Sequence, residues 1–364
     1  MKKSIALCLA IVLAISLVGC GGSATKASPA ASAAATTAAA APEIMVLTPT
    51  ESTGWTGSVA TFAKKTIDEI NAAGKYKAEL KTAASGDEQN SQLEDIAANY
   101  SKGKVVVVIL PFDDTVQSGL QAIIDKGIEY VAFDRLIAAV SSSAVANVKG
   151  DNKGVGAACG FYLVSKGMKP GDKALVFEGD TSSVTTDRKA GLESYLKGEL
   201  AFDGKKIETP WTDAQLKSLT YSGTLSWSHA NAQTWFETLM SDSSNASVKY
   251  LCAFDDSFII GVMDALKGSA ISDDIKNTFF SGKPVITGCG GAENVYQILS
   301  GESEYKDIAA KFGAICSTTY SPAMIQTAIK LMVDHLDGKT VTQDSVIKTE
   351  IVDSSNVKNY VGFN

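Results

Sequence analysis

The sequence predicts an α/β protein made of two domains, each built on a parallel sheet with helices on both faces. The chain has 364 residues, of which 45% are hydrophobic and 20% charged, so it can form two ordinary domains with their own cores. Short strand-like runs alternate with runs that repeat apolar residues every three or four positions. One run, Val105–Leu110, is apolar without a break, which indicates a strand buried on both faces.

The expected strands are short apolar runs separated by longer segments with helical periodicity. They are Ile44–Leu47, Lys77–Thr82, Val105–Leu110, Tyr130–Phe133, Lys173–Phe177, Val248–Phe254, Val285–Thr287 and Gly313–Thr319. The expected helices carry apolar residues at three- and four-residue spacing. They are Gly57–Ala73, Ser91–Ser101, Asp114–Lys126, Asn152–Gly167, Thr186–Lys197, Ala230–Met240, Ser257–Lys267, Glu293–Leu299 and Pro322–Leu336.

The N-terminal segment is typical of an export signal. Two lysines precede an apolar run over residues 5–18, which is shorter than the roughly 20 residues that span a bilayer. The run ends in Leu-Val-Gly-Cys, which resembles the lipobox of bacterial lipoproteins. We therefore expect residues 1–19 to be a lipoprotein signal peptide and Cys20 to carry the lipid. The alternative is an ordinary signal peptide with an incidental cysteine.

Residues 20–41 predict a lipidated cysteine followed by a flexible tether. The segment consists mainly of Ala, Ser, Thr and Gly and contains no aromatic residue, so it cannot bury a core. The folded body is then expected to begin near Pro42. This arrangement predicts an extracytoplasmic protein anchored to the cell membrane by its lipid, on the outer face or on the periplasmic side in a Gram-negative cell.

The charged and histidine residues exclude several functions. With Lys+Arg 33 against Asp+Glu 40 the net charge is -7, which argues against a nucleic-acid partner, because such affinity comes from clustered basic side chains. The two histidines, His229 and His335, are far apart, which leaves no His-rich metal cluster and little material for His-dependent catalysis. We expect a binding protein with no cofactor and no metal.

Four cysteines remain once Cys8 leaves with the signal and Cys20 takes lipid. Because all four lie in apolar or small-residue segments, we interpret them as buried free thiols. A bridge between Cys289 and Cys316 stays open as the one pairing to test, since both lie near strand ends. The absence of a C-x-x-C motif argues against thiol redox chemistry and zinc. The four are Cys159, Cys252, Cys289 and Cys316.

Polar and aromatic side chains gather after the predicted strands, where ligands bind in open parallel sheets. Carboxylates form paired hydrogen bonds with vicinal hydroxyls, arginine presents a fork of donors, and tryptophan covers the C–H face of a sugar ring. The pattern therefore predicts a small polyhydroxylated ligand. The strand-end residues are Glu51, Trp55, Asp113, Asp114, Asp134, Arg135, Glu178, Asp180, Arg188, Asp255 and Asp256, and Trp211 and Trp227 are further aromatic candidates.

Each of these residues also has a purely structural interpretation. Asp134-Arg135 could be a surface ion pair and Asp255-Asp256 a helix N-cap. The three tryptophans could belong to the core. The joint pattern favours a binding site over these separate explanations.

The chain from about Ile44 to Gly338 resembles bacterial type I periplasmic sugar-binding proteins of ABC importers, in particular xylose-binding and multiple-sugar-binding receptors. YVAFDRLI and the stretch around Trp227 carry the most specific part of the resemblance. The matching stretches are TPTESTGW, NSQLEDIAANYSKGKVVVVILPFDD, KGIEYVAFDRLI, VKGDNKGVGA, LSWSHANAQTWFETLM, CAFDDSFIIGVMDALKG and PVITGCGGAENVYQILSGE.

The resemblance implies two similar doubly wound lobes joined by a hinge of three crossing strands. The first lobe would hold residues 42–149 and 320–339, and the second would hold residues 150–319 and 340–364. A sugar would bind in the cleft, and ABC permease and ATPase subunits would receive it from the closed form. We expect a monomer, because the cleft needs no second chain.

The resemblance also assigns roles to several strand-end residues. Trp55 matches an aromatic residue of a first-lobe loop, and Asp134 and Arg135 match a pair that grips sugar hydroxyls. Arg188 matches an arginine that ribose-type relatives use. Asp255 holds a position that is often asparagine.

Trp227 matches an aromatic residue that borders the cleft, although Trp211 competes with it for this role.

Two departures from the family pattern alter the expected site. Gly288-Cys289-Gly290 replaces a segment that carries an acidic ligand in the family, and Tyr320-Ser321 replaces a Lys or Gln at the last crossing. Gly290 and Tyr320 remain candidate contacts, but the pocket is expected to be reshaped for another sugar or for a ligand other than a simple pentose.

Three other functions compete with sugar transport. Pairs among the strand-end carboxylates could support glycoside hydrolysis, but no other catalytic motif accompanies them. The glycines of 154–160 could suggest a dinucleotide site, but they open a helix in mid-chain. A sugar sensor that presents its closed form to a membrane receptor or histidine kinase remains the alternative. We expect no enzyme, and a receptor for a xylose-like pentose or a hexose.

Overall fold

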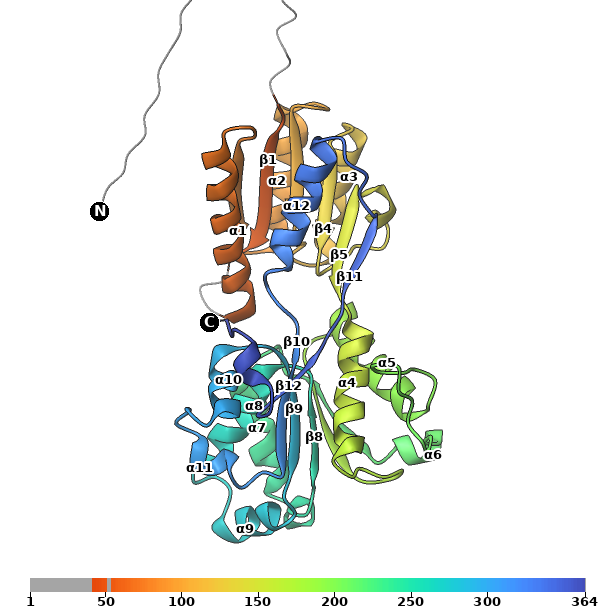
Figure 1. Ribbon diagram of the computed structural model, residues 1–364, viewed down its shortest axis with the longest axis vertical. Helices are drawn as coiled ribbons and strands as arrows, with labels where there is room; N and C mark the ends of the chain where they lie inside the picture. The colour runs from red at the N-terminus through yellow and green to blue at the C-terminus, as the bar shows by residue number, and fades with distance from the viewer. Residues whose placement is uncertain (1–40, 51–53, 364) are drawn as a thin grey trace, which may run out of the picture. The chain divides into compact units, whose positions relative to one another are not determined.

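The computed structural model describes residues 41–50 and 54–363, which belong to one compact unit running from Ala40 to Asn364 (Figure 1). Within this unit the chain forms two six-stranded sheets. The expected signal peptide, Cys20, the tether and Glu51 lie outside the described residues.

The first sheet and its helices form what we call the first lobe. The strand order is β11-β5-β4-β3-β1-β2, and every neighbouring pair is parallel. The strands are β1 (Glu43–Pro49), β2 (Ala78–Ala83), β3 (Val105–Ile109), β4 (Tyr130–Phe133), β5 (Ala146–Gly150) and β11 (Asp344–Ile347). The helices are α1 (Gly54–Ala73), α2 (Gly86–Asn99), η1 (Asp114–Val116), α3 (Gln117–Asp125), η2 (Ser141–Ser143) and α12 (Met324–Leu336).

The second sheet repeats this strand order as β12-β10-β9-β8-β6-β7, except that β12 runs antiparallel to β10. The strands of this second lobe are β6 (Ala174–Glu178), β7 (Leu219–Thr224), β8 (Tyr250–Ala253), β9 (Val285–Gly290), β10 (Ala314–Thr319) and β12 (Ile351–Asp353). The helices are α4 (Asn152–Ser165), α5 (Ser183–Leu196), α6 (Asp213–Leu216), α7 (His229–Met240), η3 (Ser243–Asn245), α8 (Asp256–Lys267), α9 (Asp273–Ser281), α10 (Glu293–Ser300), α11 (Lys306–Ala309) and η4 (Val357–Asn359). The predicted fold of two similar parallel-sheet lobes is confirmed.

Alternating side chains of the inner strands pack on opposite faces of each sheet. Val106 and Val108 join a core cluster that contains Ile329 of α12, while Val107 joins another that contains Leu120 of α3. Both faces are covered by helices, which explains why β3 is apolar at every position. In an open sheet covered in this way, ligands bind in the crevice outside the carboxyl ends of the strands.

Four strands differ from the prediction: β5, β7, β11 and β12 were not expected from the apolar pattern. β7 and β11 are sheet-edge strands whose side chains are mostly half-buried or exposed, so they lack the apolar run of an inner strand. Helix α2 begins five residues before the expected Ser91, because Ser85 caps it by accepting a hydrogen bond from the Glu88 N–H at 3.1 Å.

The boundary expected at residue 340 is wrong for β11. This strand pairs in parallel with β5 and therefore belongs to the first lobe rather than the second. Figure 1 shows β11 beside β5 at the edge of the first sheet, and α12 packs on β4 and β5. Only from β12 onward does the C-terminal segment join the second sheet.

Three segments connect the lobes: those that follow β5, β10 and β11. Backbone hydrogen bonds link them to one another. The Asp151 N–H donates to the Ile347 carbonyl at 3.0 Å, and the Thr319 N–H donates to the Glu350 carbonyl at 2.9 Å. The three crossings therefore form one hydrogen-bonded hinge.

The four cysteines of the described residues are free and buried, as predicted. Cys289 and Cys316 lie on neighbouring strands but are offset by two residues, since Cys316 pairs with Thr287. Within residues 41–50 and 54–363 no group of His, Cys, Asp and Glu side chains has the arrangement of a metal site. No helix in this part of the chain is long and apolar enough to cross a membrane.

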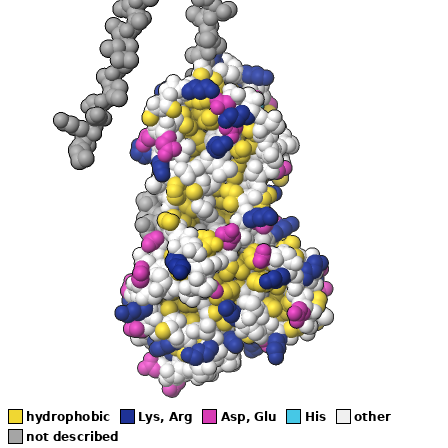
Figure 2. Space-filling model, in the orientation of Figure 1, with side chains coloured by type: hydrophobic (Ala, Val, Ile, Leu, Met, Phe, Trp, Pro, Cys, Tyr) yellow, Lys and Arg dark blue, Asp and Glu magenta, His cyan; other side chains and the backbone are white. Residues whose placement is uncertain are grey.

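Acidic and basic side chains are mixed over the surface in view. Figure 2 shows Lys and Arg interspersed with Asp and Glu on this face, over both lobes. The face therefore lacks the continuous basic stripe that recognition of a phosphate backbone requires.

Candidate functional site

A cavity of about 470 Å³ lies where strands of both lobes end. First-lobe residues after β1 and β4 and second-lobe residues after β6, β8 and β9 contribute to its wall. The structure thus brings together eight of the residues that the sequence singled out. They are Trp55, Asp134, Arg135, Arg188, Trp227, Asp255, Gly290 and Tyr320.

Tyr320 stands at the hinge and contacts both lobes. Its hydroxyl donates to Asp134 Oδ1 at 2.5 Å and accepts from Asn152 Nδ2 at 3.2 Å. The indole N–H of Trp55 donates to the Tyr320 carbonyl at 2.8 Å, and the two rings are 5.9 Å apart. Burial and the neighbouring Asp134 raise the pKa of Tyr320 well above its usual range, so the hydroxyl keeps its proton.

Arg188 forms a buried part of the cavity wall, with 3% of its surface exposed. One terminal N–H donates to the Phe254 carbonyl, and Nε donates to Asn152 Oδ1 at 3.0 Å. The guanidinium carbon is 4.6 Å from the centre of the Tyr320 ring and 5.5 Å from that of Trp227. These contacts fix a positive charge against two aromatic faces.

Asp134 and Arg135 present their side chains from a constrained turn after β4. Asp134 has a φ of 61°, in the left-handed region that only a short polar residue or glycine adopts readily. Its backbone N–H donates to the Val148 carbonyl at 2.8 Å. A terminal N–H of Arg135 donates to the Phe112 carbonyl. The carboxylate and the guanidinium are thereby held in place before any ligand arrives.

Trp227 is positioned from three sides. Its indole N–H donates to Asp180 Oδ2 at 2.9 Å, and its ring stacks on Phe258 with centres 6.2 Å apart and planes 5° from parallel. A Cβ built on Gly179 would lie 2.2 Å from the ring, so only glycine fits there. Ser226 and Trp227 also have left-handed backbones, with φ of 53° and 57°. The structure supports the sequence assignment of Trp227 to the cavity wall.

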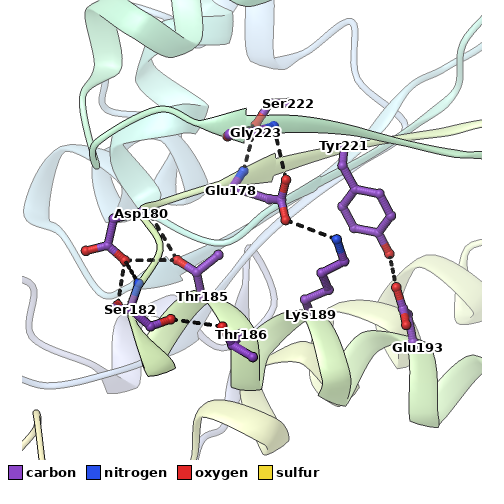
Figure 3. A network of polar contacts seen from close by, with 10 residues as sticks. All are labelled: Glu178, Asp180, Ser182, Thr185, Thr186, Lys189, Glu193, Tyr221, Ser222 and Gly223. Atoms are coloured by element: carbon purple, nitrogen blue, oxygen red, sulfur yellow. Dashed lines mark hydrogen bonds and ion pairs between the residues drawn. The ribbon is translucent and has the colours of Figure 1, made fainter.

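Asp180, which the sequence singled out only as a strand-end residue, holds this wall together. Its Oδ1 accepts hydrogen bonds from the Ser182 N–H at 2.9 Å and from the Thr185 hydroxyl at 3.3 Å (Figure 3). Burial acts to raise its pKa, but the bonds from Ser182 and Trp227 outweigh burial and hold the pKa of Asp180 below its usual value. It lies two residues beyond the end of β6, which was the signal that the sequence offered.

The edge strand β7 stabilises the same corner (Figure 3). The Gly223 N–H donates to Glu178 Oε2 at 3.0 Å, and Lys189 of α5 lies 3.4 Å from Glu178 Oε1. The Tyr221 hydroxyl donates to Glu193 Oε1 at 2.6 Å. These bonds tie β6, β7 and α5 together across the irregularity in strand pairing between Val176 and Glu178.

Asp255 both caps a helix and lines the cavity, so its structural and functional interpretations are compatible. It accepts hydrogen bonds from the Ser257 N–H at 2.9 Å and from the Ser257 hydroxyl at 2.6 Å, at the start of α8. Burial raises the pKa of Asp255, although Ser257 and Arg188 oppose the shift.

Asp256 lies beneath the cavity floor and supports the turn after β9. Its Oδ2 accepts from the Gly291 and Ala292 N–H groups, both at 2.8 Å, and from the Ser317 hydroxyl at 3.0 Å. Burial, reinforced by the charge of Asp255, raises the pKa of Asp256 to about 7. The proton on this carboxyl is therefore bound more tightly in the folded protein than in the unfolded chain.

This shift predicts a dependence of stability on pH. Because the folded pKa lies above the unfolded one, the stabilisation is complete below pH 4 and is lost as pH rises toward 7. Between pH 5 and pH 8 we expect the wild type to lose about 2 kcal/mol more unfolding free energy than Asp256→Asn. Urea unfolding of both proteins at the two pH values measures the difference, and parallel pH profiles would contradict it.

Two of the described predicted site residues, Asp113 and Trp211, do not line this cavity. Glu51 lies outside the described residues. Asp113 caps η1 through the Thr115 N–H at 2.9 Å and lines an adjoining cavity instead. Trp211 is a core residue with 3% exposure, because its segment folds back so that its backbone N–H donates to the Leu196 carbonyl at 2.8 Å. The assignment of Trp211 to the cleft is therefore corrected.

Several small polar residues of the cavity wall were not predicted. Most lie at the starts of α7 and α8 or just before α7, and they were overlooked because serine is common in helix caps as well as in binding sites. Their signal was their place next to Trp227 and Asp255 in the sequence. These residues are Ser182, Ser226, Ser228, His229 and Ser257.

Comparison with known proteins gives consistent results. A family model described as a periplasmic binding protein domain matches residues 44–340. The multiple sugar-binding periplasmic protein SbpA of Azospirillum brasilense is 27% identical over 304 residues, which cover 80% of this chain and 81% of the relative.

Solved structures show the same fold at low identity. A solute-binding protein of an ABC transporter from Mycobacterium smegmatis, with bound glycerol, has a TM-score of 0.65 and 21% identity, covering 89% of this chain and 98% of its own. The myo-inositol binding protein of Caulobacter has a TM-score of 0.64 and 17% identity, covering 87% and 95%. The type I two-lobed fold expected from the sequence is confirmed.

Proposed function

Because this chain belongs to the periplasmic binding protein domain family, we propose that it captures a monosaccharide in the cavity between its two lobes and delivers it to an ABC importer. The family and the fold are those of substrate-binding proteins rather than enzymes. The first residues of the mature chain, beginning at Cys20, would anchor the body to the membrane through lipid.

One observation carries the proposal: the cavity combines carboxylates, arginines and tryptophan rings contributed by both lobes. Asp134 and Asp255 offer acceptors for hydroxyl groups, and Trp55 and Trp227 offer apolar faces for ring C–H groups. A ligand that touches both lobes is bound most tightly when they approach each other, so binding is coupled to lobe closure.

A monosaccharide, either a xylose-like pentose or a hexose, fits this chemistry. Most polar side chains of the wall are held by the protein, so the ligand meets groups that are already oriented. The named ligands of similar proteins, multiple sugars and myo-inositol, are all polyhydroxylated. The permease and ATPase subunits of an importer would be the partners of the closed form.

Titration calorimetry and thermal shift against pentoses, hexoses and sugar alcohols test the proposal. At a concentration about 100-fold above its dissociation constant, a true ligand should stabilise the fold by about 2.7 kcal/mol. A panel of amino acids serves as the control for nonspecific stabilisation. If no sugar or sugar alcohol produces heat or a thermal shift, the proposed function is wrong.

A further inference from the structure

We propose that the preferred ligand carries a second, glycosidically linked neutral sugar unit, which occupies a second cavity next to the sugar cavity. This inference rests on the proposed function. The second cavity has a volume of about 740 Å³ and shares Arg135 and Ser182 with the first, so the two adjoin. The shared wall marks the place where a glycosidic bond would lie.

Both lobes contribute to the second cavity, as they do to the first. The segment after β3 and the turn after β4 form one side, and the loop after β6, residues 180–183, forms the other. A ligand that fills both cavities would thus contact both lobes over a larger surface than a ligand in the first cavity alone. Its second unit would add contacts that favour the same approach of the lobes.

The volumes fit one sugar ring in each cavity. A hexose has about a dozen non-hydrogen atoms, and at no more than ~30 Å³ for each, the share of a molecule in liquid water, it needs at most ~360 Å³. The first cavity, at about 470 Å³, therefore has room for one ring. The adjoining cavity, at about 740 Å³, has room for a second unit by the same measure.

Arg135 is suited to the junction between two units. Its guanidinium carries five N–H donors, and the structure shows one hydrogen bond, to the Phe112 carbonyl. The remaining donors stand on the wall common to both cavities, where a glycosidic or ring oxygen would accept them. The Ser182 hydroxyl, which donates to Asp180, can accept a hydrogen bond there as well.

The walls of the second cavity indicate a neutral carbohydrate. Phe112, Leu136 and Ala138 offer apolar surface, whereas Asp113 and Asp114 offer carboxylates on the same side. Within the described part of the chain, the Asp114 side chain has no hydrogen bond or ion pair, so both of its oxygens can accept from hydroxyls. Carboxylates repel an anion, which disfavours a sugar phosphate or a uronic acid.

Calorimetry with matched sugars tests the inference. The probes are glucose against maltose and cellobiose, and xylose against xylobiose, each titrated into the wild-type protein. We expect one disaccharide to bind about tenfold more tightly than its monosaccharide, because a second set of one or two hydrogen bonds is gained. If the monosaccharides bind and no disaccharide binds more tightly, the inference is wrong while the proposed function stands.

Two variants test whether the second sugar unit occupies the adjoining cavity. Ala138→Trp fills the adjoining cavity and should lower disaccharide affinity about tenfold while leaving monosaccharide affinity within about twofold. Asp114→Asn should also lower disaccharide affinity, because it removes a charged hydrogen-bond acceptor. Ala98→Trp, at an exposed position of α2 in the same lobe, is the matched control and should change neither affinity.

Equal losses for both ligand types in Ala138→Trp would overturn the inference, because the substitution would then act on the first cavity. A complete lack of binding by mono- and disaccharides in the wild type would instead reject the proposed function. The two failures are therefore distinguishable.

Discussion

Asp134→Asn is expected to lower sugar affinity about 100-fold, which corresponds to about 2.7 kcal/mol. The substitution keeps the shape of the side chain and tolerates the left-handed backbone at this position. Its amide oxygen can still accept the hydrogen bond from Tyr320. What it removes is the negative charge that would accept hydroxyl donors, and hydrogen bonds to charged groups contribute about 1.5–3 kcal/mol each.

Calorimetry on the best ligand of the sugar panel measures this loss. Asp125→Asn provides a matched control, because Asp125 is an exposed carboxylate of the same lobe that bonds only to Gln121 in the structure. The control should bind like the wild type, and both variants should unfold at similar temperatures. Affinity of Asp134→Asn within about threefold of the wild type would show that Asp134 does not hold the ligand.

Gly156→Ala is expected to destabilise the protein by about 3 kcal/mol, the upper end of the range for overpacking. Helices α4 and α5 touch through their backbones at this point. A Cβ on Gly156 would lie 1.8 Å from the Arg188 carbonyl oxygen and 2.6 Å from the Leu192 nitrogen. Backbone atoms of a packed helix cannot move aside as a side chain can, so the two helices must separate.

The same substitution should weaken sugar binding, because Arg188 belongs to the displaced helix and to the cavity wall. Urea unfolding gives the stability and calorimetry gives the affinity. Gly282→Ala is the control, since its Cβ would meet only the Phe279 carbonyl oxygen, at 3.4 Å. Stability of Gly156→Ala equal to that of this control would contradict the close packing of α4 on α5.

The sequence predicted the fold class because inner parallel strands must be apolar on both faces, as Val105–Ile109 is. It missed β7 and β11 for the converse reason. An edge strand is solvated along one side, and its side chains need not be apolar. Its membership in the sheet depends on hydrogen bonds with a partner that is distant in sequence, such as β5 for β11.

The candidate site was predictable where a residue directly follows an inner strand, as Asp134 and Asp255 do. The error at Trp211 has a different origin. A tryptophan in a connecting segment can face the core or the cleft, and the direction depends on how its loop folds over α5, which no local pattern determines. Asp180 was missed as a positioning residue because its importance lies in the bond to Trp227, 47 positions away in the chain.

The glycines of α4 are a second case in which local sequence does not determine the role of a residue. As a motif they allowed a dinucleotide-binding interpretation, but the structure gives Gly156 and Gly160 a packing role against α5. Sequence spacing alone could not separate these, since both uses need a backbone without Cβ atoms.

Asp134, Ser226 and Trp227 share left-handed backbones, and all three line the cavity. Each such conformation costs an L-residue roughly 1–2 kcal/mol. Selection for thermal stability alone would therefore favour glycine at Ser226, where the side chain is exposed. That replacement would relieve the backbone but would also make the turn that carries Trp227 more flexible, because glycine restricts the backbone least. At this turn, a substitution that improves stability is therefore expected to weaken ligand recognition.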